Sequence, residues 1–214
     1  MGGRSEWFVE FAKWGFVGVD VFFVISGFVI CYTTMTKPRT VANALLFLKH
    51  RFLRVFLGYW PFFLALFSFY WAFMPLTLEP FNLWGSFFLY ETNMFELLLP
   101  VTWSLTYELY FYSMFFVLLF FSSKWVLPFS IGMSAVVLVF SVLWYPTGNE
   151  ALNLLFYPLL LEFFLGVLLY FVYEKLQRRA YALVALLIAM TLFALGVYQG
   201  DYNGLMRIYA FGLG

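Results

Sequence analysis

Residues 15–30 read Gly-Phe-Val-Gly-Val-Asp-Val-Phe-Phe-Val-Ile-Ser-Gly-Phe-Val-Ile, and this stretch decides which kind of fold the chain can adopt. It is apolar enough to sit in lipid, yet it carries Asp20. A carboxylate in a bilayer is costly unless it is paired, neutralised or close to water. Gly15, Gly18 and Ser26 fall on roughly one helical face, where small side chains let a second helix approach. We therefore expect a packed membrane-spanning helix, with Asp20 either held for a purpose or placed at the headgroup boundary.

The composition extends this expectation to the whole chain. Of the 214 residues, 64% are hydrophobic and only 11% are charged, whereas soluble domains average about 25% charged residues. Such a chain cannot cover itself with a polar surface, so the lipid bilayer must be its partner. The net charge of +1 offers no polyanion-binding surface, and we expect no nucleic acid partner. One cysteine, Cys31, and one histidine, His50, cannot form a zinc site, so no metal is expected.

The apolar runs predict an all-α fold, a polytopic transmembrane helix bundle. A spanning helix needs about 20 mostly apolar residues, and about six full spans are predicted on that basis. The segment 81–100 is interrupted by acidic residues and predicts a short helix, 83–90, followed by an irregular loop. The tail 205–214 begins a further, truncated span. The six predicted spans are 14–32, 55–74, 101–121, 125–144, 152–173 and 181–198.

Charge predicts the orientation of these spans. The predicted loops 33–54, 122–124 and 174–179 are basic, whereas the loops between them carry acids and no Lys or Arg. Basic loops stay in the cytoplasm. The same alternation places 81–100 and the N-terminus outside, in a plasma (inner) membrane.

Three stretches, which follow one another along the chain in the order found in the family, resemble acyltransferase family 3, the membrane O-acyltransferases of bacterial surface and exopolysaccharides. A weaker match is Leu-Glu-Phe-Phe-Leu-Gly at 161–166. The resemblance covers most of the chain. The three stretches are Gly-Val-Asp-Val-Phe-Phe-Val-Ile-Ser-Gly-Phe at 18–28, Arg-Phe-Leu-Arg at 51–54 with Tyr-Trp-Pro at 59–61, and Trp-Ser-Leu-Thr-Tyr-Glu-Leu-Tyr-Phe-Tyr at 103–112.

The resemblance implies transfer of an acyl group, often acetyl, from cytoplasmic acyl-CoA to a hydroxyl of a carbohydrate acceptor. Acyl-CoA is then a substrate, and no bound cofactor is implied. The family has a further helix before the Gly-Val-Asp motif and several helices beyond Gly214. Residues 1–214 are thus expected to be a single incomplete acyltransferase domain, and the natural chain is expected to have an additional N-terminal span. That span would also explain how Arg4 and Lys13 come to lie outside.

Arg51 and Arg54 are the candidates for binding acyl-CoA. They stand three residues apart, so they share one helix face, and two guanidinium groups suit bidentate contact with phosphates. The family ties this Arg-x-x-Arg element to function. The alternative is that Lys and Arg at a cytoplasmic span end serve topology alone.

The motif at 103–112 supplies the candidate pocket. Ser104, Glu108 and Tyr112 form one polar stripe at helical spacing, and Glu108 inside a span should face a cavity or a partner. The family pattern matches Trp103, Ser104 and Glu108, and implies a pocket or structural carboxylate near the outer side. A pairing of Glu108 with an arginine of another helix is the alternative. Asp20, Ser26 and Trp60 join the candidates because they lie within matched motifs, whereas Glu162 is assigned to packing or pairing.

The catalytic base remains unknown. Acyl transfer to a hydroxyl commonly uses a histidine, but the family's essential histidine lies in the first helix, which is missing from this sequence. His50 lies in a basic cytoplasmic loop on the wrong side for an external hydroxyl, so we do not nominate it. The fragment alone is therefore expected to have little activity. A transporter or flippase would also suit intramembrane acids and a basic mouth, and a non-catalytic remnant is the third reading.

Overall fold

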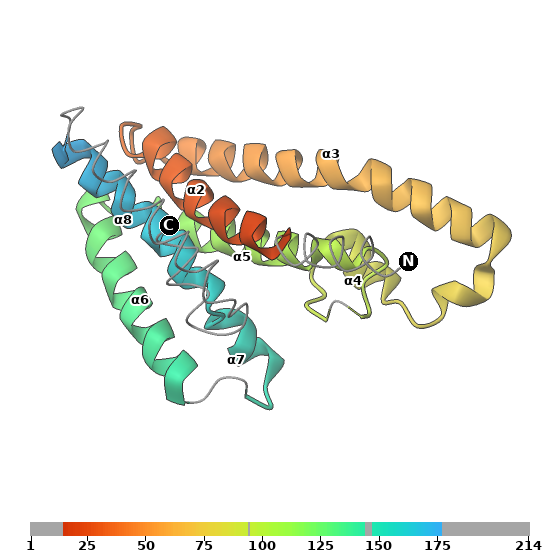
Figure 1. The fold of residues 1–214 in the computed structure, drawn as a ribbon. Helices are drawn as coiled ribbons and strands as arrows, with labels where there is room; N and C mark the ends of the chain where they lie inside the picture. The colour runs from red at the N-terminus through yellow and green to blue at the C-terminus, as the bar shows by residue number, and fades with distance from the viewer. Residues whose placement is uncertain (1–14, 94, 144–146, 177–214) are drawn as a thin grey trace, which may run out of the picture. The chain divides into compact units, whose positions relative to one another are not determined.

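The structure, a computed structural model, describes residues 15–93, 95–143 and 147–176 (Figure 1). These residues form helices joined by turns and loops, with no strand among them, which confirms the all-α prediction. The chain divides into two compact units, residues 1–37 with 123–214, and residues 38–122. We call them unit 1 and unit 2 and describe each by itself.

Unit 1 is built around a pair of parallel helices. Its elements in chain order are α2 (Gly15–Thr34), the 3-10 turn η3 (Ser123–Trp125), α6 (Val126–Leu143), α7 (Glu150–Leu155) and α8 (Leu159–Leu176). Helix α8 packs against both α2 and α6. The Val24 carbonyl of α2 lies against Gly166 of α8. One turn further along both helices, the Phe28 ring contacts the Tyr170 ring. Helices α2 and α8 therefore run in the same direction (Figure 1).

Two glycines let the backbones of α2 and α8 meet. A Cβ added at Gly166 would overlap the Val24 carbonyl oxygen, and one added at Gly27 would overlap the Phe163 carbonyl oxygen. The prediction for Gly18 is wrong, because a Cβ there meets no described atom within 4 Å. Ser26 is buried as expected. The packing face of α2 is thus rotated from Gly18 toward Gly27.

Unit 2 consists of one long helix packed along a shorter antiparallel one. Its elements are α3 (Val41–Phe73), the 3-10 turn η1 (Pro75–Leu78), α4 (Leu83–Phe88), the 3-10 turn η2 (Pro100–Thr102) and α5 (Trp103–Leu118). Phe47 contacts Phe115 near the start of α3, and Tyr59 lies beside Thr102 further along. This register runs α3 and α5 in opposite directions (Figure 1).

Helix α3 begins earlier than the sequence predicts. The Thr40 side chain caps it by accepting from the Asn43 N–H at 3.3 Å, and Asn43 Nδ2 donates to the Pro38 carbonyl at 2.8 Å. Pro38 therefore ends the preceding turn and does not break the basic stretch. The prediction of a loop over 33–54 is wrong from residue 41 onward, and Arg51 and Arg54 lie inside a 33-residue helix.

The segment between η1 and η2 is held by a dense set of hydrogen bonds. The Glu91 carboxylate accepts from Asn82 Nδ2 and from the N–H groups of Thr92 and Asn93, each at 2.9 Å. The buried Ser86 hydroxyl accepts from the Leu98 N–H at 3.0 Å. The predicted short helix is confirmed as α4, and the loop beside it is ordered by its own polar side chains.

Three of the described helices are long and apolar enough to cross a membrane, namely Val41–Phe73, Ser123–Leu143 and Ala151–Lys175. The segment Gly18–Thr34 is a shorter apolar helix. The predicted span 101–121 is only 16 residues of α-helix in α5, because Pro100 starts a 3-10 turn before it. The predicted span 152–173 is interrupted before Leu159, where Pro158 has no N–H to donate. Segments 181–198 and 205–214 lie outside the described residues.

Candidate functional site

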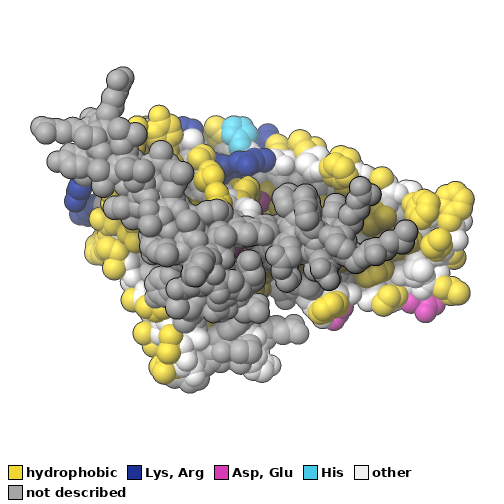
Figure 2. Space-filling view, viewed as in Figure 1, with side chains coloured by type: hydrophobic (Ala, Val, Ile, Leu, Met, Phe, Trp, Pro, Cys, Tyr) yellow, Lys and Arg dark blue, Asp and Glu magenta, His cyan; other side chains and the backbone are white. Residues whose placement is uncertain are grey.

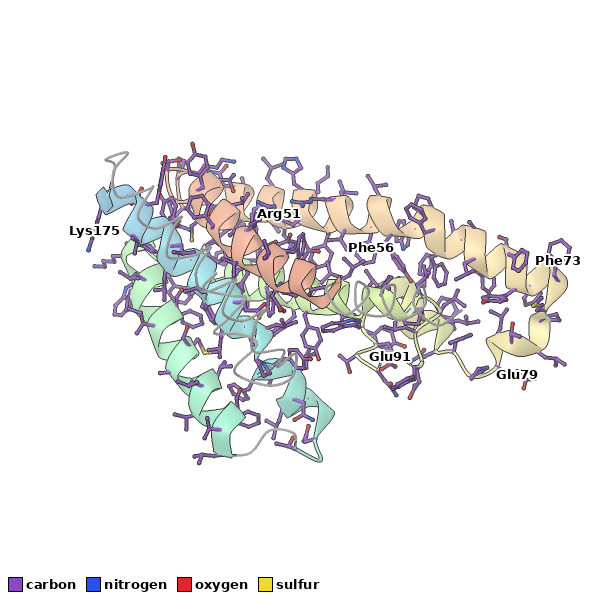
Figure 3. The ribbon with its side chains drawn as sticks, viewed as in Figure 1. Arg51, Phe56, Phe73, Glu79, Glu91 and Lys175 are labelled. Carbon is purple, nitrogen blue, oxygen red and sulfur yellow. The ribbon has the colours of Figure 1, made fainter. Side chains whose placement is uncertain are left out.

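The candidate site in unit 2 begins with Arg51 on α3. Its guanidinium carbon lies 5.7 Å from the centre of the Phe47 ring, one helical turn earlier, and 5.5 Å from the centre of the Tyr112 ring on α5. These are cation–π distances. Arg51 is half-buried and labelled in the first half of α3 in Figure 3. The arginine therefore points along the interface between α3 and α5 instead of standing in a solvated loop.

Tyr112 links this arginine to an acid. The Tyr112 hydroxyl donates a hydrogen bond to Glu108 Oε1, one turn earlier on α5. Glu108 is 3% exposed, and its carboxylate lies near enough to Arg54 and Arg51 to feel their charge. Burial disfavours the charged form of a carboxylate, and nearby opposite charge and hydrogen bonding offset part of that cost. We call Arg51, Arg54, Glu108 and Tyr112 the Arg–Glu cluster.

The cluster joins what the sequence presents as two separate sites. The antiparallel register brings Tyr112 level with Arg51, so Glu108 comes level with Arg54. Glu108 thus lies near the basic part of α3 in the α3–α5 pair, and its placement near the outer side stays a prediction. The alternative, an acid interacting with an arginine of another helix, describes the observed electrostatics better.

Ser104 and Trp103, also from the 103–112 motif, lie outside the Arg–Glu cluster. Ser104 is half-buried, and its hydroxyl contacts the Val101 carbonyl of its own chain segment at 3.4 Å. Trp103 is buried and packs edge-on against Tyr107, with ring centres 5.9 Å apart. The predicted polar stripe therefore reduces to Glu108 and Tyr112.

Trp60 on α3 contacts helix α4. Its indole N–H donates to the Phe87 carbonyl at 3.2 Å, and its ring stacks on the Phe87 ring at 5.2 Å. The neighbouring Tyr59 hydroxyl donates to the Ser86 carbonyl at 2.9 Å. Residues 59 and 60 therefore anchor α4 to α3, about two turns away from Arg51 along the helix.

The stretch of α3 around Arg51 is basic. Lys49, His50 and Arg54 are all exposed on α3. Figure 2 shows dark-blue basic side chains beside the cyan histidine. Opposite-sign ligands are attracted to such a patch. The arrangement can hold an anion at Arg54.

Unit 1 carries the remaining candidates. Asp20 on α2 and Glu162 on α8 are both fully buried. Each stands four residues before the closest contact of the two helices, which is made by Val24 and Gly166. Because the helices are parallel, the two acids lie at the same level of the α2–α8 pair. Cys31 is also fully buried.

Sequence reasoning missed Phe47. It stands four residues before Arg51, which is the spacing of side-chain neighbours on a helix. The predicted loop over residues 33–54 hides this signal. A capping reading of Thr40 followed by Asn43 would have extended the helix and placed Phe47 beside Arg51.

Comparison with known proteins gives one match. A family model described as an acyltransferase domain, that of acyltransferase family 3, matches residues 2–213. No curated protein and no solved structure matches the chain.

Proposed function

The chain belongs to acyltransferase family 3, and we propose that it moves an acyl group, usually acetyl, from cytoplasmic acyl-CoA to a hydroxyl of a cell-surface or exported carbohydrate. That it is a membrane acyltransferase follows from the family and from its long apolar helices. The donor, the acceptor and the sidedness are the proposed part.

The Arg–Glu cluster is the observation that carries the donor assignment. Acyl-CoA presents several phosphates, and guanidinium groups bind phosphate bidentately with charge-assisted hydrogen bonds. Arg54 is exposed and Arg51 half-buried on the same side of α3, at the basic end of a helix long enough to span. The carboxylate of Glu108 lies close enough to both arginines to interact with their charge, and it accepts a hydrogen bond from the Tyr112 hydroxyl.

The proposed reaction forms an ester bond between the acceptor oxygen and the acyl carbon, and it breaks the thioester C–S bond. The hydroxyl proton must pass to a base, and the departing thiolate of coenzyme A takes up a proton. Histidine is the usual base for such a step. The sequence holds one histidine, His50, which is exposed beside the basic patch. We assign no base to the chain, and the expectation of little activity from these 214 residues alone stays a prediction.

Sidedness follows from the same residues. We place the protein in the inner membrane with the Arg51 end of α3 in the cytoplasm, because acyl-CoA is a cytoplasmic donor and basic residues favour that side. The opposite end of α3, at Phe73, would then lie outside, where the carbohydrate acceptor is met.

Binding of acetyl-CoA to the purified chain in lipid nanodiscs tests the proposal. Each of Arg51→Ala and Arg54→Ala removes a charged hydrogen-bond donor, worth about 1.5–3 kcal/mol, so we expect the dissociation constant to rise at least about tenfold. Lys124→Ala is the matched control, since Lys124 is also basic and predicted at a cytoplasmic turn but lies in unit 1. Unchanged affinity in Arg54→Ala, or an equal loss in Lys124→Ala, would refute the donor assignment.

A further inference from the structure

Arg51 lies against two aromatic rings that come from different helices and contact each other. Phe47 reaches it from one turn earlier on α3, and Tyr112 reaches it from α5, with the guanidinium carbon 5.7 and 5.5 Å from the two ring centres. A guanidinium is planar, so it can stack its face on a ring while its N–H groups point outward in the plane. Ring contact and hydrogen bonding therefore use different parts of the same side chain.

The two rings are themselves fixed in place. Phe47 and Tyr112 meet edge to face, with centres 6.3 Å apart and planes at 83°. Phe47 also contacts the ring of Phe115 at 6.0 Å, and Phe115 is fully buried. Tyr112 is likewise fully buried, and its hydroxyl is tied to Glu108. Packed rings of this kind cannot follow a moving arginine, so they set its position.

We infer that the contacts with Phe47 and Tyr112, which we call the aromatic clamp, restrain the guanidinium group of Arg51, which makes these two residues positioning residues for recognition of the donor's phosphates. This inference rests on the proposed function, in which Arg51 contacts the donor. Holding a side chain in its binding geometry lowers the conformational entropy that binding would otherwise cost. The exposed Arg54 then supplies a second, adaptable contact beside the fixed one.

The clamp predicts a difference in chemical reactivity that needs no ligand. Phenylglyoxal modifies accessible guanidinium groups, and mass spectrometry gives the rates at Arg51 and Arg54 within one sample. Phe47→Leu and Tyr112→Leu each remove one ring, so we expect the Arg51 rate to rise about threefold relative to Arg54, as a cation–π contact of this class implies. Tyr112→Phe keeps the ring and should leave the ratio within about twofold of the wild type.

An unchanged ratio in Phe47→Leu would overturn the clamp. Tyr112 is fully buried, so Tyr112→Leu is interpreted only if its thermal unfolding remains cooperative. Phe47→Leu, at a position 9% exposed, and the conservative Tyr112→Phe decide the question without it. A ratio that rises in Tyr112→Phe as much as in Phe47→Leu would show that the hydroxyl, and not the ring, restrains Arg51.

Acetyl-CoA binding then separates the clamp from the proposed function. If the wild-type chain binds no acetyl-CoA, the donor assignment fails, while the reactivity ratio still decides the clamp. If it binds, Phe47→Leu should raise the dissociation constant for acetyl-CoA about threefold in the chain that keeps Arg51. The same substitution should leave the dissociation constant unchanged in the Arg51→Ala variant. Equal losses in both backgrounds would mean that Phe47 acts on the fold alone.

Discussion

At the scale of single residues, two carboxylates of unit 2 lie where other polar groups meet them. Glu108 has Tyr112 and the charges of two arginines, and Glu91 has one amide and two N–H donors. The same principle applies to one hydroxyl in segment 81–99. The Ser86 hydroxyl accepts from the Leu98 N–H, and both residues are buried.

Ser86→Ala removes that acceptor and leaves the Leu98 N–H buried. An unsatisfied buried donor costs about 1–3 kcal/mol, so we expect the free energy of unfolding in detergent micelles to fall by about that amount. Ser113→Ala is the control, because the Ser113 hydroxyl bonds only to the Leu109 carbonyl of its own helix and the residue is exposed. Equal stability of the two variants would contradict the role given to Ser86.

At the scale of elements, helix contacts in this chain depend on how closely two backbones can approach. Helices α2 and α8 meet at Gly27 and Gly166, where any side chain would overlap a carbonyl of the other helix. Without water to drive helices together in lipid, such close packing is a main source of association. Gly166 lies at the end of the weakest of the quoted sequence matches, and its role is structural.

Gly166→Ala should therefore disrupt unit 1. The added methyl group must push α8 away from Val24, and overpacking of this kind costs about 1–3 kcal/mol. Gly132→Ala on α6 is the matched control, because a Cβ there meets no described atom within 4 Å. Thermal unfolding in nanodiscs checks the pair. A melting temperature that falls equally in both variants would show that the glycine contact between α2 and α8 does not matter.

At the scale of the whole molecule, the sequence predicts the class of helical membrane protein well and the boundaries of its helices less well. Long apolar runs define α6 because nothing interrupts them, whereas the charged run around Arg51 hides the start of α3. The charged residues of this stretch predict a loop, but the Thr40 cap and the packing against α5 stabilise a helix there. The apolar run at 151–175 is long enough to span, as predicted, but contains a break between α7 and α8 that composition does not reveal.

The candidate site shows the same division. Arg51, Arg54, Glu108 and Tyr112 are recognised from spacing and from the family resemblance, since each motif is local. That they form one cluster depends on the antiparallel register of α3 and α5, which no local pattern encodes. Trp60 and Ser104 lie in matched motifs, yet their contacts are with α4 and with their own helix start.

Length matters at this scale too. Helix α3 has 33 residues, which at 1.5 Å per residue is about 50 Å, longer than a hydrocarbon core of about 30 Å. A helix of this length is long enough to reach from one side of the membrane to the other. His50 is exposed near the basic end, whereas Glu79 follows the other end and is also exposed (Figure 3).

Labelling of single cysteines in oriented vesicles tests the central claim, that the Arg51 end of α3 receives acyl-CoA from the cytoplasm. We predict that a membrane-impermeant maleimide labels His50→Cys only in inside-out vesicles, that it labels Glu79→Cys only in right-side-out vesicles, and that acetyl-CoA slows labelling at position 50. The native Cys31 is fully buried and provides the background. Labelling of His50→Cys from the outside, or no protection by acetyl-CoA, would contradict the donor site.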